Sequence, residues 1–103
     1  MIIFTVSIKE YMKITTICIP NIHNYLSKTY IVNVLEKLEI GTIKSIIERR
    51  IKNDNNYKSV ILRVIIDSNT TGGNIVLDNF QKGKTVKIVH KKNDTCWKLI
   101  NAY

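Results

Sequence analysis

The sequence predicts an α+β domain with strands and helices in the order βαββαβ, followed by a C-terminal hairpin arm. We expect two helices on one face of an antiparallel sheet, and the other face open to solvent or to a partner. The first observation is that short β-branched segments alternate with two segments of helical periodicity. The second is a length of 103 residues with 45% hydrophobic content, which suits one domain with a modest core.

The first strand is expected at residues 13–19, which are rich in β-branched residues. It should end at the turn signal Pro20-Asn21. Because side chains alternate along a strand, Ile17 and Ile19 should share one face and Cys18 should lie on the other.

The first helix is expected to begin after Ser27, a residue type that caps helix starts. Ile31, Leu35 and Leu38 then follow at positions i, i+4 and i+7, which predicts one apolar stripe on about three turns of helix. Gly41 lies just beyond the stripe and is predicted to be the C-cap glycine.

Two further strands are expected at residues 42–51 and 57–66, joined by a polar loop. The Ile46-Ile47 pair interrupts the alternation of the second strand, which predicts a bulge there. In the third strand the alternation separates two faces, with Val60, Leu62 and Val64 on one and Ser59, Ile61 and Arg63 on the other.

The last third of the chain predicts a short helix and a hairpin. The helix is expected at residues 74–82, since the Gly72-Gly73 pair disfavours an earlier start. Gly83 then offers a C-cap. Residues 85–90 alternate cleanly, and residues 95–102 can return antiparallel to them as the hairpin arm.

The net charge of +8 would attract a polyanion such as a nucleic acid. An alternative origin is mutational bias, because isoleucine, lysine and asparagine, which have AT-rich codons, together fill 43 positions. No apolar run approaches the ~20 residues of a membrane span, and residues 1–8 lack the features of a signal peptide. Cys18 and Cys96 are expected as free thiols. We therefore expect an intracellular protein that is not secreted and has no membrane partner.

Two segments resemble the motifs of RNA recognition motifs (RRMs). Residues 17–22, ICIPNI, match five of the six positions of the hexamer on the family's first strand, and Cys18 takes the aromatic position. Residues 57–64, YKSVILRV, lie where the family's octamer would lie on the third strand. Ser59 and Ile61 stand at its exposed aromatic positions.

The arrangement as a whole is most similar to small RRM-like proteins of giant DNA viruses. The matching stretches are residues 17–22, 57–60, 87–90 and 97–99. This resemblance implies a ferredoxin-like, RRM-like domain over residues 12–103, with residues 1–11 as an N-terminal extension. It also implies a viral protein located in the host-cell cytoplasm or in the virion.

The resemblance implies a function in RNA binding, with a departure at the stacking positions. RRMs hold RNA chiefly by stacking bases on exposed sheet aromatics flanked by basic residues. All three usual platform positions are non-aromatic here, and each missing stack removes ~1–3 kcal/mol of binding free energy. We therefore expect weak single-stranded RNA binding through other residues of the open sheet face. These residues are Lys44, Arg49, Tyr57, Arg63, Lys87, Trp97 and Lys98.

Two alternatives accompany this expectation. The chain can be a protein-interaction or structural viral module that kept the fold and lost RNA binding, with Cys18 and Ile61 as the contact residues. Trp97 can pack in the core or the hairpin instead of stacking a base.

The sequence contains no discernible catalytic constellation. His23 and His90 lie far apart without the spacing of metal ligands. Cys18 has no apparent carboxylate that would orient a base beside it. The Gly72-Gly73 pair lacks the spacing of nucleotide-binding loops. We therefore expect a protein that is not an enzyme and has no catalytic residues, metal or cofactor.

Overall fold

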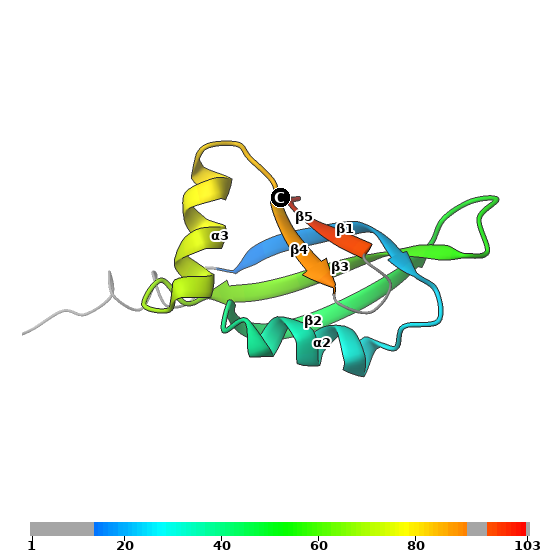
Figure 1. The fold of residues 1–103 in the computed structure, drawn as a ribbon, viewed down its shortest axis with the longest axis horizontal. Helices are drawn as coiled ribbons and strands as arrows, with labels where there is room; N and C mark the ends of the chain where they lie inside the picture. The colour runs from blue at the N-terminus through cyan, green and yellow to red at the C-terminus, as the bar shows by residue number, and fades with distance from the viewer. Residues whose placement is uncertain (1–13, 91–94, 103) are drawn as a thin grey trace, which may run out of the picture.

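The computed structural model describes residues 14–90 and 95–102. Within them lie five strands and two helices (Figure 1). Their bounds are β1 (Thr15–His23), α2 (Lys28–Lys37), β2 (Gly41–Arg50), β3 (Tyr57–Ile66), α3 (Thr71–Gln81), β4 (Val86–His90) and β5 (Thr95–Asn101).

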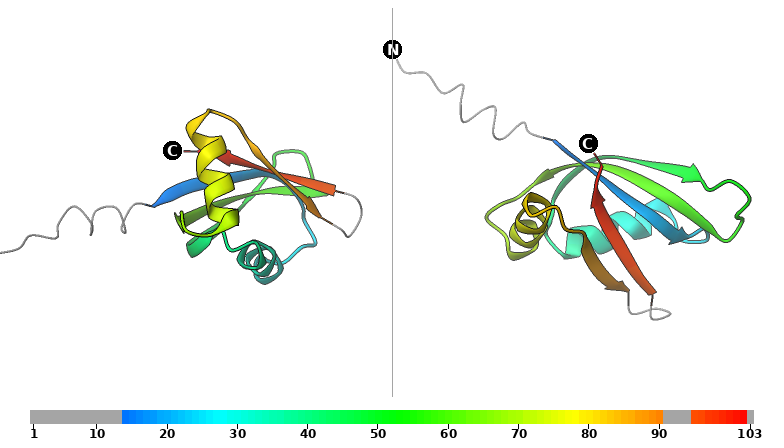
Figure 2. Two further views of the ribbon diagram at one scale, coloured as in Figure 1. Left: turned by 60° about the vertical axis from the view of Figure 1, so that its left-hand side comes forward. Right: turned by 90° about the horizontal axis from the view of Figure 1, so that it is seen from above.

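The strands form one sheet in the order β2-β3-β1-β5-β4, and every neighbouring pair is antiparallel (Figure 2). The α+β class, the antiparallel sheet and the two helices are thereby confirmed, but the strand count and order differ from a plain βαββαβ. The last strand, β5, takes the inner position beside β1, and β4 lies at the edge. Burial accounts for this order, since β5 carries the fully buried Trp97 and Leu99, whereas the five-residue β4 exposes Lys87 and Val89.

Both helices pack on the same face of the sheet. α2 contacts β2, and α3 contacts β3 and β4. The start of α3 also meets the end of α2, where Gly72 lies against the Leu38 carbonyl. The strand residues beneath the helices form the core. Ile17 and Ile19 of β1 share one face, as predicted, and the structure shows that it is the buried one. The inward face of β3 is confirmed for Val60, Leu62 and Val64.

The cap of α2 is predicted correctly at its start but not at its end. The Ser27 hydroxyl accepts a hydrogen bond from the Tyr30 backbone N–H at 3.1 Å. Leu38 is the C-cap, and Glu39 takes the positive φ of 54°. Gly41 is instead the first residue of β2, where a Cβ would collide with the Ile65 backbone.

α3 begins earlier than predicted. Thr70 caps it by accepting a hydrogen bond from the Gly73 N–H at 3.0 Å, so both glycines lie in the first turn. Glycine is required at position 73, because a Cβ there would overlap the Asp67 carbonyl oxygen. Gly83, with φ of 71°, follows the Lys82 C-cap in the predicted place.

Two bulges set which residues face away from the helices. β1 does not end at Pro20, because it continues to His23 after a register shift between Ile19 and Ile22. The bulge of β2 lies between Ile43 and Ser45 rather than at Ile46-Ile47.

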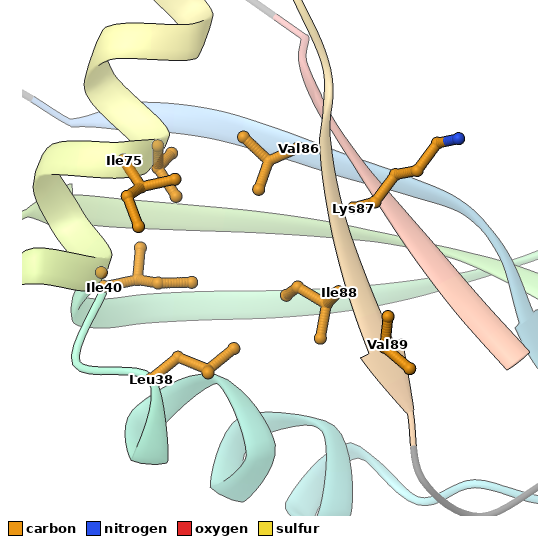
Figure 3. Close-up of a pocket in the computed structure, with 9 residues that line it drawn as sticks. Leu38, Ile40, Ile75, Val86, Lys87, Ile88 and Val89 are labelled. Carbon is orange, nitrogen blue, oxygen red and sulfur yellow. The ribbon is translucent and has the colours of Figure 1, made fainter. Parts of the chain in front are cut away.

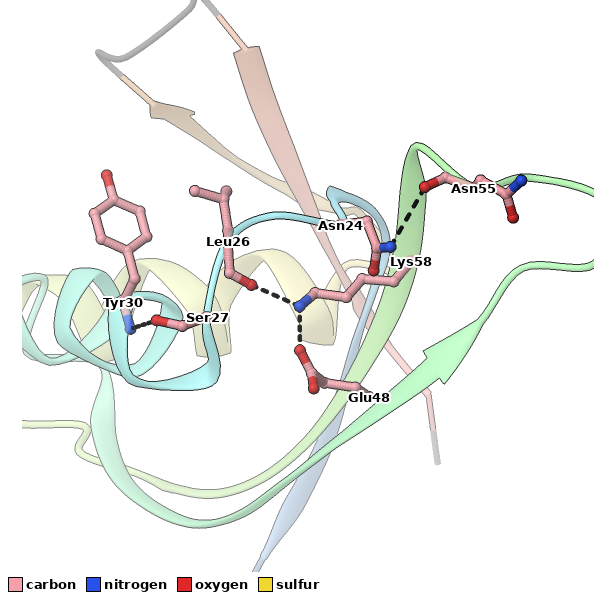
Figure 4. Close-up of polar contacts among 7 residues, drawn as sticks. All are labelled: Asn24, Leu26, Ser27, Tyr30, Glu48, Asn55 and Lys58. Atoms are coloured by element: carbon pink, nitrogen blue, oxygen red, sulfur yellow. Dashed lines mark hydrogen bonds and ion pairs between the residues drawn. The ribbon is translucent and has the colours of Figure 1, made fainter.

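A buried lysine joins the β1–α2 loop to the sheet. Lys58 of β3 is 6% exposed, donates a hydrogen bond to the Leu26 carbonyl at 2.5 Å and forms an ion pair with Glu48 of β2 (Figure 4). The Asn24 side-chain amide also donates to the Asn55 carbonyl at 3.3 Å. These contacts fix the end of the sheet where β1 meets the β2–β3 turn.

Candidate functional site

The face of the sheet opposite the helices, hereafter the open face, carries four exposed basic residues. Strand alternation and the pairing register place Arg49 of β2, Arg63 of β3, Lys87 of β4 and Lys98 of β5 on it. Lys44 is exposed within the β2 bulge, beside the Ser45 that pairs with Arg63. The structure therefore places four of the five predicted basic residues on the open face, and Lys44 lies in the β2 bulge.

Within residues 14–90 and 95–102, no acidic side chain lies on the open face. Glu48 points to the helix-covered face, where it pairs with Lys58. The other acids in this part of the chain lie on helices or in loops, as Glu36, Glu39, Asp54, Asp67 and Asp78. The charged side chains that the described residues contribute to the open face are therefore all positive.

Lys87 and Lys98 are direct cross-strand partners on this face, and both are exposed. Like charges placed directly opposite each other on a sheet are destabilising. An anion bound between the two ammonium groups would relieve their repulsion.

Among the described residues, those at the centre of the open face are apolar and include no aromatic ring. One row across four strands consists of register partners, namely Ile47, Ile61, Cys18 and Ile100. Ile47 is 53% exposed. Burial raises the pKa of the Cys18 thiol, and the nearby Arg49 guanidinium partly opposes that rise. A thiol with a raised pKa is a poor nucleophile at neutral pH.

The two aromatic residues predicted for the site lie in different places. Trp97 is 1% exposed and lies on the helix-covered face in the core, so its expected stacking role at the open face is wrong. The alternation of β5 explains this, since Lys98 occupies the open face and its neighbour must point inward. Tyr57 lies on the open face at the start of β3 and is 37% exposed.

Sequence reasoning missed two aromatic residues beside Tyr57. The His23 ring stacks on the Tyr57 ring with centroids 4.7 Å apart and an interplanar angle of 29°. The Tyr25 ring lies 5.3 Å from the His23 ring. We call these three residues the aromatic cluster. The sequence signal for this cluster is the Pro20-Asn21 pair, which predicts a strand end but lies within the bulge that turns His23 to this face.

An apolar groove of about 240 Å³ lies on the other side of the sheet, between α2, α3 and β4 (Figure 3). The side chains of Leu38, Ile40, Ile75, Val86 and Ile88 line it. Leu38, which was expected to be part of the buried helix stripe, is instead 40% exposed at this groove.

The described part of the chain holds no group of three His, Cys, Asp or Glu side chains that could bind a metal ion. Neither α2 nor α3 is long and apolar enough to cross a membrane. The proposed N-terminal extension, residues 1–11, lies outside the described residues.

No protein-family model, curated protein or solved structure matches this chain.

Proposed function

We propose that this protein binds single-stranded RNA through the open face of its sheet, weakly and with little sequence preference. The observation that carries the proposal is the charge of that face, where four strands contribute exposed cations and no described acid lies among them. The pairing of two like charges, Lys87 and Lys98, adds to it. Phosphates of a single strand are the complementary ligand.

The basic residues would bind the phosphates, and the apolar centre of the open face explains why the RNA affinity is weak. Arg49, Arg63, Lys87 and Lys98 would each neutralise a phosphate, with Lys44 at the margin. Cys18, Ser59 and Ile61 offer no ring on which a base can stack, so the ~1–3 kcal/mol of each usual stack is missing. Binding is then mainly electrostatic and depends little on base identity.

The RRM-like relationship is part of the same proposal. In a ferredoxin-like βαββαβ sheet the last strand lies beside the first, and β5 has that neighbour here. The edge strand β4 would then be an addition within the α3–β5 connection. The sequence resemblance to RRM-like proteins of giant DNA viruses supports this reading.

The test is a titration of a labelled oligouridylate with the full chain at about 50 and 200 mM salt. Four contacts to a single strand predict a log–log slope of the association constant on salt of about −3. The double variant Lys87→Gln/Lys98→Gln should weaken binding and reduce the slope by about 1.4. A control with the same loss of charge, Lys28→Gln/Lys37→Gln on the exposed side of α2, should leave the slope unchanged. Equal effects of the two variants would reject the open face as the binding surface.

A protein-interaction function is the second candidate, because the Ile47–Ile61–Cys18–Ile100 row is an apolar strip on the sheet face that neither α2 nor α3 covers. Such a strip suits an apolar partner surface better than phosphates. The same titration separates the two functions. Absence of RNA binding at the lower salt concentration would favour the protein partner, with Ile61 and Cys18 at the contact.

A further inference from the structure

The aromatic cluster lies at one end of the open face, where β1 ends and β3 begins. His23 and Tyr57 are register partners across these two strands, so their rings project from the same face as Arg63 and Ile61. Tyr25 remains 66% exposed although its ring lies near that of His23. Three aromatic rings thus gather in contact with solvent, away from the hydrophobic core.

The bulge in β1 is what creates this cluster. Ile17 and Ile19 point to the core, and strict alternation would send His23 to the core as well. The register shift between Ile19 and Ile22 places Ile22 in the core at 1% exposure and turns His23 to the open face. Bulges occur next to functional sites, where they re-aim a side chain. The cross-strand pairing of the His23 and Tyr57 rings would contribute only about 0.2–1 kcal/mol to stability, so stability alone is a weak reason for exposing two rings there.

A cation lies next to the cluster on the same face. Arg49 pairs with Ser59, which is two residues from Tyr57 along β3. Two residues of strand span about 7 Å, so the long Arg49 side chain can reach a phosphate adjoining a base that sits on the rings. Aromatic side chains beside a basic groove are the elements by which proteins hold single strands irrespective of sequence.

We propose that the aromatic cluster is a nucleobase-stacking site, with the exposed Tyr57 ring as the platform and Arg49 as the contact to the adjoining phosphate. This inference rests on the proposed RNA binding of the open face and deepens it. Bases would then stack at the end of the sheet where β1 ends and β3 begins, and not at its centre, where Cys18, Ser59 and Ile61 offer no ring.

The test compares Tyr57→Ala with Tyr57→Phe in the oligouridylate titration, using the full chain. Loss of the ring should weaken binding about 5- to 150-fold, which corresponds to a stack of ~1–3 kcal/mol. Because stacking involves no counterion release, the salt slope should stay unchanged in Tyr57→Ala. Tyr57→Phe keeps the ring and should bind like the wild type. Arg49→Gln should instead reduce the slope by about 0.7.

An abasic oligonucleotide of equal length distinguishes stacking from a structural effect. It keeps the phosphates and lacks bases, so Tyr57→Ala and the wild type should bind it equally. Equal weakening for both oligonucleotides would assign Tyr57 a structural role and overturn the inference. Unchanged uridylate binding by Tyr57→Ala would also overturn it, while leaving RNA binding intact. Absence of wild-type binding would reject the proposed function itself. Should Tyr57→Ala not fold, Tyr57→Leu, which keeps an apolar contact with His23, takes its place.

Discussion

Lys58 and Glu48 form an ion pair between β3 and β2 on the helix-covered face, and the Lys58 ammonium also binds the Leu26 carbonyl (Figure 4). The side chain of Lys58 is 8% exposed and that of Glu48 is 32% exposed. The pair therefore joins two strands and the loop before α2 around a cation that has little access to water.

Glu48→Ala should destabilise the protein because it leaves the Lys58 ammonium buried with one carbonyl partner. We expect a loss of about 1.5–3 kcal/mol, the range for hydrogen bonds to charged groups. The double variant Lys58→Met/Glu48→Leu should recover most of it, since no uncompensated charge remains. Urea unfolding measures both. Arg50→Ala, at an exposed neighbour, should stay within about 0.5 kcal/mol. A double variant less stable than Glu48→Ala would contradict this account.

Gly73→Ala should destabilise the protein although alanine is the better helix former. The added methyl group would overlap the Asp67 carbonyl oxygen, and the backbone must move. Overpacking of this kind costs about 1–3 kcal/mol or more, which exceeds the gain of about 1 kcal/mol in helix propensity. Gly83→Asn is the matched control. The φ of Gly83 is positive, but a Cβ added there would meet no other part of the protein within 4 Å. Asparagine tolerates that conformation, so thermal unfolding should change little. A Gly73→Ala variant more stable than the wild type would show that the Asp67 backbone can move away from the added methyl group at little cost.

The fold was predictable where the sequence signal is local. Period-2 alternation assigned the faces of Ile17, Ile19 and the β3 residues, and the Ser27 hydroxyl identified the start of α2. These signals depend on neighbours a few residues away, so they can be recognised in the sequence alone.

The features that were mispredicted depend on distant segments. Gly41 and Gly72 lie against the Ile65 and Leu38 backbones, and a single sequence does not show that those segments come close. The bulge after Ile19 is visible only against the register of β3. Since that bulge places His23, the basic half of the candidate site could be predicted and most of its aromatic half could not.

The fluorescence of Trp97 should not respond to RNA. It is the sole tryptophan and is buried at 1% exposure on the face opposite Lys98. We expect blue-shifted emission, weak quenching by iodide, and an unchanged spectrum at saturating oligouridylate. The Trp97→Phe variant should lose stability because a buried aromatic residue becomes smaller, but it should bind RNA as the wild type does when folded. Strong quenching of the Trp97 fluorescence by RNA would indicate that Trp97 contacts the RNA.

The final prediction concerns Cys18 and its neighbour Arg49. Burial raises the pKa of the Cys18 thiol, and the Arg49 guanidinium counteracts this by favouring the thiolate. The thiolate is the reactive form, and its fraction falls as the pKa rises above the pH. Cys18 should therefore be alkylated by iodoacetamide more slowly than the exposed Cys96, and its rate should increase as the pH is raised towards the thiol pKa.

Arg49→Gln should slow the alkylation of Cys18 further, because removal of the cation leaves burial unopposed and raises the thiol pKa again. Peptide mapping by mass spectrometry reports the two cysteines separately, so Cys96 serves as the internal reference. Arg50→Gln is the matched control: it loses the same charge from the adjacent residue, whose side chain points to the opposite face. It should leave Cys18 unaffected. Faster alkylation in Arg49→Gln would mean that Arg49 chiefly shields the thiol, and equal effects of both variants would mean that its side chain does not extend over the centre of the open face.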